Sequence, residues 1–104
     1  AEHAFSAFVV ANPKHEQAGA AQYWLGVTHF VRGENEKAAA AFAKGYKTYP
    51  KCSKASDTLL KFAKTLALQG RNADACMALE QLQKNFPKAH IKEVASERKK
   101  SKCE

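Results

Sequence analysis

Residues 33–51 read GENEKAAAAFAKGYKTYPK, and residues 70–88 read GRNADACMALEQLQKNFPK. Both stretches open on a glycine and close on an aromatic residue, a proline and a lysine, and the second begins 37 residues after the first. The same step separates the three prolines of the chain, which are Pro13, Pro50 and Pro87. A fixed step of this size indicates a repeat architecture, in which each unit packs on the next.

Each unit is predicted to form two helices. Apolar residues recur at helical spacing from Ala21 to Val31 and again from Ala38 to Tyr46. Gly33 suits the end of the first helix because glycine tolerates a positive φ. Pro50 lies just beyond the second helix, where its missing amide hydrogen is harmless. Neither alternating hydrophobicity nor a hairpin turn signal appears, so the expected fold class is all-α.

The next unit repeats this plan from residue 51. Ser53 or Ser56 is expected to cap its first helix, and Asn72 its second. Residues 1–11 are expected to form the second helix of an earlier unit, and residues 90–103 the first helix of a following one. The prediction is therefore a solenoid of about six antiparallel helices. Small residues should let the helices approach while aromatic residues fill the layers between them: Gly26, Ala38, Ala63 and Ala75, with Trp24, Phe30, Phe42 and Phe62.

At 104 residues and 11.4 kDa the chain makes one small domain. No apolar run reaches the length of a membrane span, and the first residues do not form a signal peptide. The formal net charge is +7, and residues 43–71 carry most of the excess as lysines. Lysines spread along helices form a solvated face. Nucleic-acid binding is disfavoured because the basic residues of this block are nearly all lysines, whereas base recognition favours arginines interleaved with aromatic residues. These lysines are Lys44, Lys47, Lys51, Lys54, Lys61 and Lys64.

The chain offers no pattern for a metal, a cofactor or catalysis. Its cysteines, Cys52, Cys76 and Cys103, form no CxxC motif, and their odd number leaves at least one unpaired. Whether the other two pair is left open by their spacing. No phosphate loop, nucleophile elbow or acid and base pair is present, so we expect neither an enzyme nor a bound cofactor. Metal-ligand spacing is also missing among His3, His15, His29 and His90, of which His29 is expected to be packed or hydrogen-bonded.

The spacing of key residues resembles the tetratricopeptide repeat. The first unit carries the pattern at Leu25, Gly26, Gly33, Ala38, Phe42 and Pro50, and the second at Phe62, Ala63, Gly70, Ala75, Leu79 and Pro87. An aromatic residue directly before Leu25 and a step of 37 rather than 34 residues depart from the common form. These two departures, together with four short stretches, resemble the C-terminal repeat domain of the periplasmic cell-division coordinators of the Tol-Pal system. The stretches are 23–26, 49–51, 54–57 and 59–61. Ala75-Cys76 and residues 97–103 resemble the alphaproteobacterial branch.

This resemblance implies a non-enzymatic periplasmic adaptor with a right-handed superhelical fold. It implies a protein secreted by a signal peptide, trimeric through an N-terminal coiled coil outside this sequence, that binds the energy-transducing protein TolA. Such a protein coordinates peptidoglycan synthesis with outer-membrane constriction at division, so a peptidoglycan synthase is a second candidate partner. The domain is expected to span residues 1–104, divided into the end of a truncated repeat (1–13), two repeats (14–50 and 51–87) and a capping helix (88–104).

In such a solenoid the first helix of each pair lines the binding groove. The candidate groove residues are Tyr23, Val27, Phe30, Leu60, Lys61 and Lys64. The aromatic residues could instead be packing residues, and the lysines could be an ordinary solvated pair. If the groove binds a segment, its lysines would attract acidic groups and its aromatic residues would take apolar side chains.

The periplasmic setting also favours a disulfide between Cys76 and Cys103, because the capping helix should pack against the helix that carries Cys76. Cys52 is then expected to be exposed and unpaired. Two alternatives remain open. One is an outer-membrane assembly or self-associating repeat module with a different partner, and the other is a thiol enzyme that uses Cys52 beside Lys54.

Overall fold

The computed structural model describes residues 2–11 and 17–103, and all regular secondary structure in these ranges is helical. The prediction of an all-α repeat fold with about six helices is therefore confirmed for the described part of the chain. The helices are α1 (Glu2–Ala11), α2 (Ala18–Val31), α3 (Asn35–Thr48), α4 (Ala55–Leu68), α5 (Asn72–Asn85) and α6 (Ile91–Lys100).

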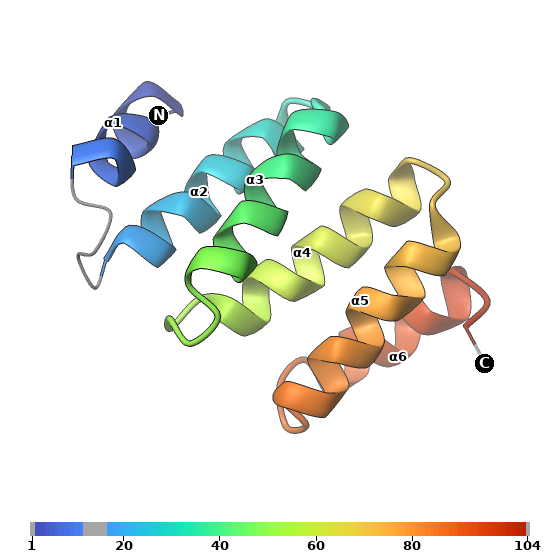
Figure 1. The fold of residues 1–104 in the computed structure, drawn as a ribbon. Helices are drawn as coiled ribbons and strands as arrows, with labels where there is room; N and C mark the ends of the chain where they lie inside the picture. The colour runs from blue at the N-terminus through green and yellow to red at the C-terminus, as the bar shows by residue number, and fades with distance from the viewer. Residues whose placement is uncertain (1, 12–16, 104) are drawn as a thin grey trace.

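The 37-residue step of the sequence is also a step of the structure. Adding 37 to both ends of α2 gives the bounds of α4, and the same shift carries α3 onto α5. Neighbouring helices run antiparallel, and the pairs follow one another along the molecule (Figure 1). The described part of the chain is elongated, with principal extents of 41 × 27 × 18 Å. Pro13, the first proline of the step, lies outside the described residues.

A glycine follows the first helix of each pair, as the sequence predicts. Gly33 and Gly70 have φ angles of 75° and 77°, the left-handed region that favours glycine. At the first turn the Glu34 amide donates to the carbonyl of His29 at 2.9 Å, and the Gly33 amide donates to Phe30 at 3.1 Å. This pair of bonds is the Schellman motif, which satisfies carbonyls at the helix end.

The predicted serine and asparagine caps are wrong. Helix α4 follows Lys54, α5 follows Arg71, and neither start has a side-chain capping hydrogen bond. Ser53 therefore lies before the helix without capping it, Ser56 lies within the first turn of α4, and Asn72 is the first residue of α5. Both helices have an acid in the first turn, Asp57 and Asp74, where the positive end of the helix dipole favours a negative charge.

The core depends on small residues facing large ones across each helix pair. The Phe42 ring is fully buried and lies against Gly26, where an added Cβ would stand 2.5 Å from a ring carbon. One step later, Ala63 and Leu79 occupy the same two positions, and both are buried in the cluster formed by α4, α5 and α6. The buried alanines Ala38 and Ala75 complete the matched set. The prediction that small residues allow close approach is confirmed here.

Trp24 does not fill a layer between helices, in contrast to the prediction. Its side chain is 41% exposed, whereas Phe42 is buried and Phe30 and Phe62 are half-buried. The residue one step later is Lys61, which also lies on the outer side of its helix. Trp24 and Lys61 occupy equivalent positions of the repeat, and both point outward. The aromatic side chain of Trp24 does not turn this position toward the core.

The last helix covers the core with one side and carries lysines on the other. Val94 is buried in the core, and the Lys99 and Lys100 side chains are exposed. Lys102 has a φ of 57°, and the next amide, that of Cys103, donates to the carbonyl of Arg98 at 2.8 Å. This Schellman-type turn directs the chain back toward α5.

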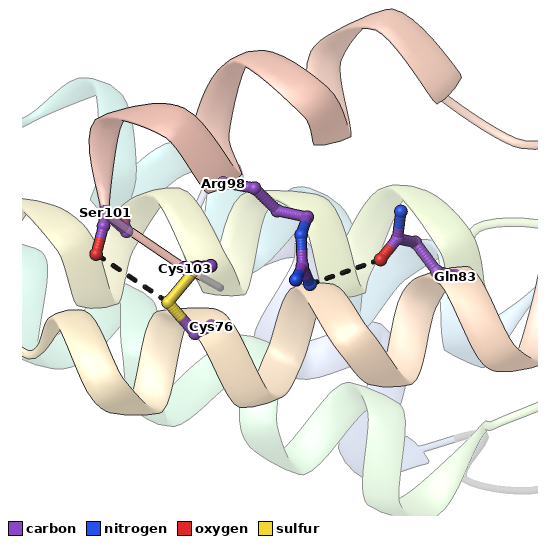
Figure 2. The surroundings of a disulfide bond; sticks show 5 residues. All are labelled: Cys76, Gln83, Arg98, Ser101 and Cys103. Carbon is purple, nitrogen blue, oxygen red and sulfur yellow. Dashed lines mark hydrogen bonds between the residues drawn. A yellow bond between two sulfur atoms is a disulfide. The ribbon is translucent and has the colours of Figure 1, made fainter.

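The turn brings Cys103 to Cys76 on α5, and their sulfur atoms lie at disulfide-bonding distance (Figure 2). The Cys76 sulfur also lies 3.7 Å from the carbonyl oxygen of Ser101. Next to the cysteine pair, the Arg98 guanidinium donates to the Gln83 side chain at 3.2 Å. Helix α6 is thus attached to α5 by two side-chain links besides its buried valine.

Candidate functional site

The first helices of the units, α2, α4 and α6, present side chains that meet on one face of the molecule. The Lys61 ammonium lies 5.0 Å from the centre of the Phe30 ring and so connects α4 to α2. Lys64 donates to Glu93 at 3.3 Å and connects α4 to α6. We call this surface the A-helix face, and its members are Trp24, Phe30, Lys54, Asp57, Lys61, Lys64, His90 and Glu93.

The lysines of this face are engaged by groups of the chain itself. Lys54 lies 5.8 Å from the Tyr23 ring centre and 5.3 Å from that of Trp24, so it interacts with both aromatic faces. Cation–π contacts of this kind contribute about 0.5–1 kcal/mol at exposed sites. Because Lys61 and Lys64 also have internal partners, the face is not an open cluster of positive charge. The expected attraction for acidic segments is weaker than the lysine count indicates.

A histidine connects the acidic groups of the face. His90, in the left-handed region with a φ of 52°, directly precedes α6. Its Nε2 lies 3.1 Å from Asp57 on α4, and its Nδ1 lies 3.6 Å from Glu93. The hydrogen bond from Lys64 lowers the pKa of Glu93, and the positive charge of Lys64 adds to this effect. The ion pairs that link α4 to α6 therefore favour the ionised carboxylate.

The structure separates the six predicted groove residues into two groups. Tyr23 is 7% exposed and Leu60 is 4% exposed, and each belongs to a core cluster. Burial is the main cause that raises the pKa of the Tyr23 phenol. Val27, Phe30, Lys61 and Lys64 are half-buried and keep part of their surface accessible. Tyr23 and Leu60 thus support the face from below rather than presenting side chains on it.

A cavity of about 380 Å³ lies at the C-terminal ends of α2, α4 and α6. Its walls combine apolar surface with two amines and a carboxylate, and they contain the hydroxyl of Ser101, which is buried without a hydrogen-bond partner. Such a cavity suits an apolar side chain that carries a polar group nearby. The lining residues are Phe30, Lys64, Ala67, Leu68, Asn72, Glu97, Lys100 and Ser101.

Several residues of the A-helix face could not be predicted as site residues from the sequence. Asp57, His90 and Glu93 meet across two helices that are distant in the sequence, so no local motif contains them. Trp24 is apolar and aromatic, and these properties favour a place in the core. Its alignment with Lys61 at the 37-residue step is the signal for an outward position.

The remaining chemistry-bearing residues have structural surroundings. His29 is buried and its Nδ1 lies 2.9 Å from Glu34, which confirms a packed, hydrogen-bonded role; this bond is also the main cause that lowers the pKa of Glu34. Cys52 is a free cysteine but only half-exposed, because Gly19 lies against it. His15 and the side chain of His3 lie outside the described part. Among described side chains, no group of three or more His, Cys, Asp or Glu residues could hold a metal ion.

The helices are too short or too polar to span a membrane. In residues 2–11 and 17–103, none of them is both long enough and apolar enough to cross a bilayer.

Comparison with known families identifies the repeat. Residues 20–51 and 57–89 match the family model described as tetratricopeptide repeat, and together they cover more than half of the chain. The two matches correspond to the pairs α2–α3 and α4–α5. No curated protein shows significant similarity to the sequence.

Proposed function

This chain belongs to the tetratricopeptide-repeat family, and we propose that it is an adaptor that holds a segment of a cell-envelope protein on its A-helix face. Tetratricopeptide repeats are protein–protein interaction modules and are typically non-enzymatic. The surface and the partner are what the proposal adds to this general role.

We choose the A-helix face because side chains of three helices contact one another on it. Contacts of Lys61 with Phe30 and of Lys64 with Glu93 link α2, α4 and α6 at this surface, and the buried clusters beneath it hold the helices in place. A preorganised surface loses less entropy on binding than a flexible one. The cavity at its end offers space for one apolar side chain of the bound segment.

One feature of the sequence and one of the structure support a finer role in the Tol-Pal system. Four short stretches resemble the repeat domain of periplasmic cell-division coordinators: 23–26, 49–51, 54–57 and 59–61. The Cys76–Cys103 pair at bonding distance suits an oxidising compartment such as the periplasm. On this proposal the chain coordinates peptidoglycan synthesis with outer-membrane constriction.

The partners belong to the same proposal. A TolA-type envelope protein is the first candidate, and a peptidoglycan synthase is the second. The full protein is proposed to trimerise through an N-terminal coiled coil outside this sequence, with residues 1–104 forming its single repeat domain. The partner segment is expected to be mainly apolar, because the lysines of the face already have internal partners.

Calorimetric titration of the oxidised chain with the periplasmic part of a TolA-type protein tests this role. Lys61→Glu should weaken binding by removing the contact that joins α4 to α2. Lys84→Glu is the matched control, because it makes the same charge change at an exposed position of α5. Undetectable binding would overturn the Tol-Pal role, and equal weakening by both variants would overturn the choice of face. A mass that rises with concentration without a partner would favour the self-associating alternative.

A further inference from the structure

Two equivalent grooves lie between the second helices of the units. One is walled by α1 and α3 over α2 and has a volume of about 210 Å³. The other is walled by α3 and α5 over α4 and has a volume of about 330 Å³. Six residues of the first groove are Val9, Gln22, Leu25, Ala40, Ala41 and Lys44. The residues 37 positions after these six line the second groove, so one feature of the surface occurs twice.

The packing of the helices explains why these grooves are open. The backbones of α2 and α4 contact each other, which closes the layer of first helices. In the described part of the chain, the backbone of α3 contacts neither α1 nor α5. Figure 1 shows α4 between α3 and α5, and α4 contacts both of them. The space above each intervening first helix therefore stays open.

The α3–α5 groove is apolar between two polar ends. At the C-terminal end of α5, Asn85 donates to the hydroxyl of Tyr46 on α3 at 2.6 Å and links the two walls. At the N-terminal end of α5, Arg71 and Asp74 form an ion pair at 2.8 Å. Met77 lines the groove between these ends, and 68% of its side chain is exposed. Because the polar groups at the ends partner one another, the groove mainly offers apolar surface to a ligand.

The basic block of the sequence is divided between two surfaces of the molecule. The lysines of the A-helix face have internal partners. In contrast, Lys44 and Lys47 are exposed on α3, and neither forms an ion pair with a described residue. The chain has no acidic residue between Glu36 and Asp57. The positive charge on α3 is therefore uncompensated.

Each groove has one of these lysines beside it. Lys44 lines the α1–α3 groove together with Val10. One repeat step after Val10 is Lys47, which takes the equivalent place beside the α3–α5 groove. The surface thus combines two apolar hollows with free positive charge. We call it the B-helix face, and its members are Val10, Ala40, Lys44, Lys47, Phe62 and Met77.

We propose that the B-helix face is a second docking site, which takes an acidic amphipathic segment of another protein. The segment crosses α3, places one apolar side chain in each groove and sets its carboxylates against Lys44 and Lys47. Ala40, exposed on α3, is small enough to let the segment approach closely. Met77 is flexible and polarisable, so it adapts to the apolar side chain in its groove. The B-helix face shares no residue with the A-helix face, so the domain can hold two partners at once.

Charge and surface together decide the occupant. A second copy would bring its own Lys44 and Lys47 to this face, and copies with a net charge of +7 repel one another. A nucleic acid would satisfy the lysines and leave the apolar grooves empty. An acidic segment with apolar side chains satisfies both features.

Selection of random peptides displayed on phage tests the proposal. The bait is the oxidised chain, and peptides that also bind the variant carrying Lys44→Glu and Met77→Ser are discarded. We expect the remaining peptides to be acidic and to carry two apolar residues. Titrated into the isotope-labelled chain, such a peptide should shift the amides of α1, α3 and α5. Because the probe is not a TolA-type protein, the result is independent of the Tol-Pal role.

Variants at exposed positions separate the charged contribution from the apolar one. Lys44→Glu with Lys47→Glu should weaken peptide binding about tenfold and remove its dependence on salt. Lys92→Glu, the same charge change on α6, should alter neither. Met77→Ser should weaken binding about tenfold and keep the salt dependence. Val31→Ser changes a similarly exposed apolar residue of α2 and should have no effect.

Several results would overturn the proposal. One is a selection that leaves no peptide, or only peptides without acidic residues. Another is a set of amide shifts confined to α2, α4 and α6. Self-association of the chain that Met77→Ser abolishes would assign the face to a second copy instead. Binding of single-stranded DNA that Lys44→Glu weakens and Met77→Ser does not would assign it to nucleic acid.

Discussion

Gly26 of α2 lies against the ring of Phe42 of α3 so closely that a Cβ added to the glycine would stand 2.5 Å from a ring carbon. The equivalent pair in the next repeat is Ala63 with Leu79, in which one methyl group is gained and one ring is lost. Each unit thus packs its two helices together with a different combination of side-chain volumes at this contact.

The pairing predicts a specific coupling between two substitutions. Gly26→Ala should destabilise the domain by about 1–3 kcal/mol, because the added methyl group overpacks the interface. Gly26→Ala with Phe42→Leu reproduces the combination of the second repeat. Its loss of stability should be smaller than the sum of the single losses by more than about 0.5 kcal/mol. Urea unfolding of the four proteins of this cycle measures the coupling, and strict additivity would contradict the packing described.

The cysteine pair predicts a redox-dependent stability. Reduction, or Cys76→Ser, removes a link that spans 27 residues of sequence. In the chain-entropy description, a loop of this length stabilises the folded state by about 3–4 kcal/mol. The urea midpoint should fall on addition of reductant. Cys52→Ser, which changes the free cysteine, should keep that response, and a midpoint insensitive to reductant in the oxidised wild type would exclude the link.

The C-terminal turn predicts a stabilising substitution. Lys102 has a φ of 57°, a conformation that costs a residue with a side chain about 1–2 kcal/mol. Lys102→Gly should raise stability by a net of about 0.5 kcal/mol, because glycine loses more chain entropy on folding. Lys99→Gly, within α6, should instead destabilise by about 1 kcal/mol. Thermal unfolding of the two variants checks the opposite signs, and a loss in both would contradict the geometry of the turn.

The ion pairs between α4 and α6 predict a dependence on pH. The pKa of Glu93 is lowered below its ordinary value of 4.5, chiefly by the hydrogen bond from Lys64. A lowered pKa in the folded state means that the ionised carboxylate stabilises the protein above about pH 4.5. This contribution is lost as the pH falls through the folded-state pKa.

Glu93→Gln should therefore unfold at lower urea than the wild type at pH 7, by a small amount because the pair is exposed. The difference should narrow as the pH falls below 4.5, and it should vanish below the lowered folded-state pKa, where the wild-type carboxylate is protonated as well. Glu80→Gln, on the exposed side of α5, is the control for loss of a carboxylate. A difference between Glu93→Gln and the wild type that is constant from pH 7 to pH 3 would contradict the role of this ion pair.

The helices and their order could be predicted because each is encoded locally. Gly33 and Gly70 mark helix ends through their own backbone freedom, and the apolar spacing marks the buried sides. The helix starts could not be predicted as well, since the caps expected at Ser53 and Asn72 depend on where the first turn begins. That position is decided by packing of the whole helix rather than by one polar side chain.

The site was predictable only in part for a related reason. The sequence indicated which helices line the face, and it identified Phe30, Lys61 and Lys64 among its residues. It could not show that Lys61 would lie on the Phe30 ring or that Lys64 would reach Glu93. These contacts join residues of different units, and they change the chemistry of the face from free positive charge to paired groups.

Binding of a protein segment to the A-helix face is tested most directly by an amide chemical-shift map. The oxidised, isotope-labelled chain would be titrated with the periplasmic part of a TolA-type protein. We expect shifts concentrated on α2, α4 and α6, around Val27, Phe30, Lys61 and Lys64, with the exposed sides of α3 and α5 unchanged. Shifts concentrated on α3 and α5 would contradict binding at this face.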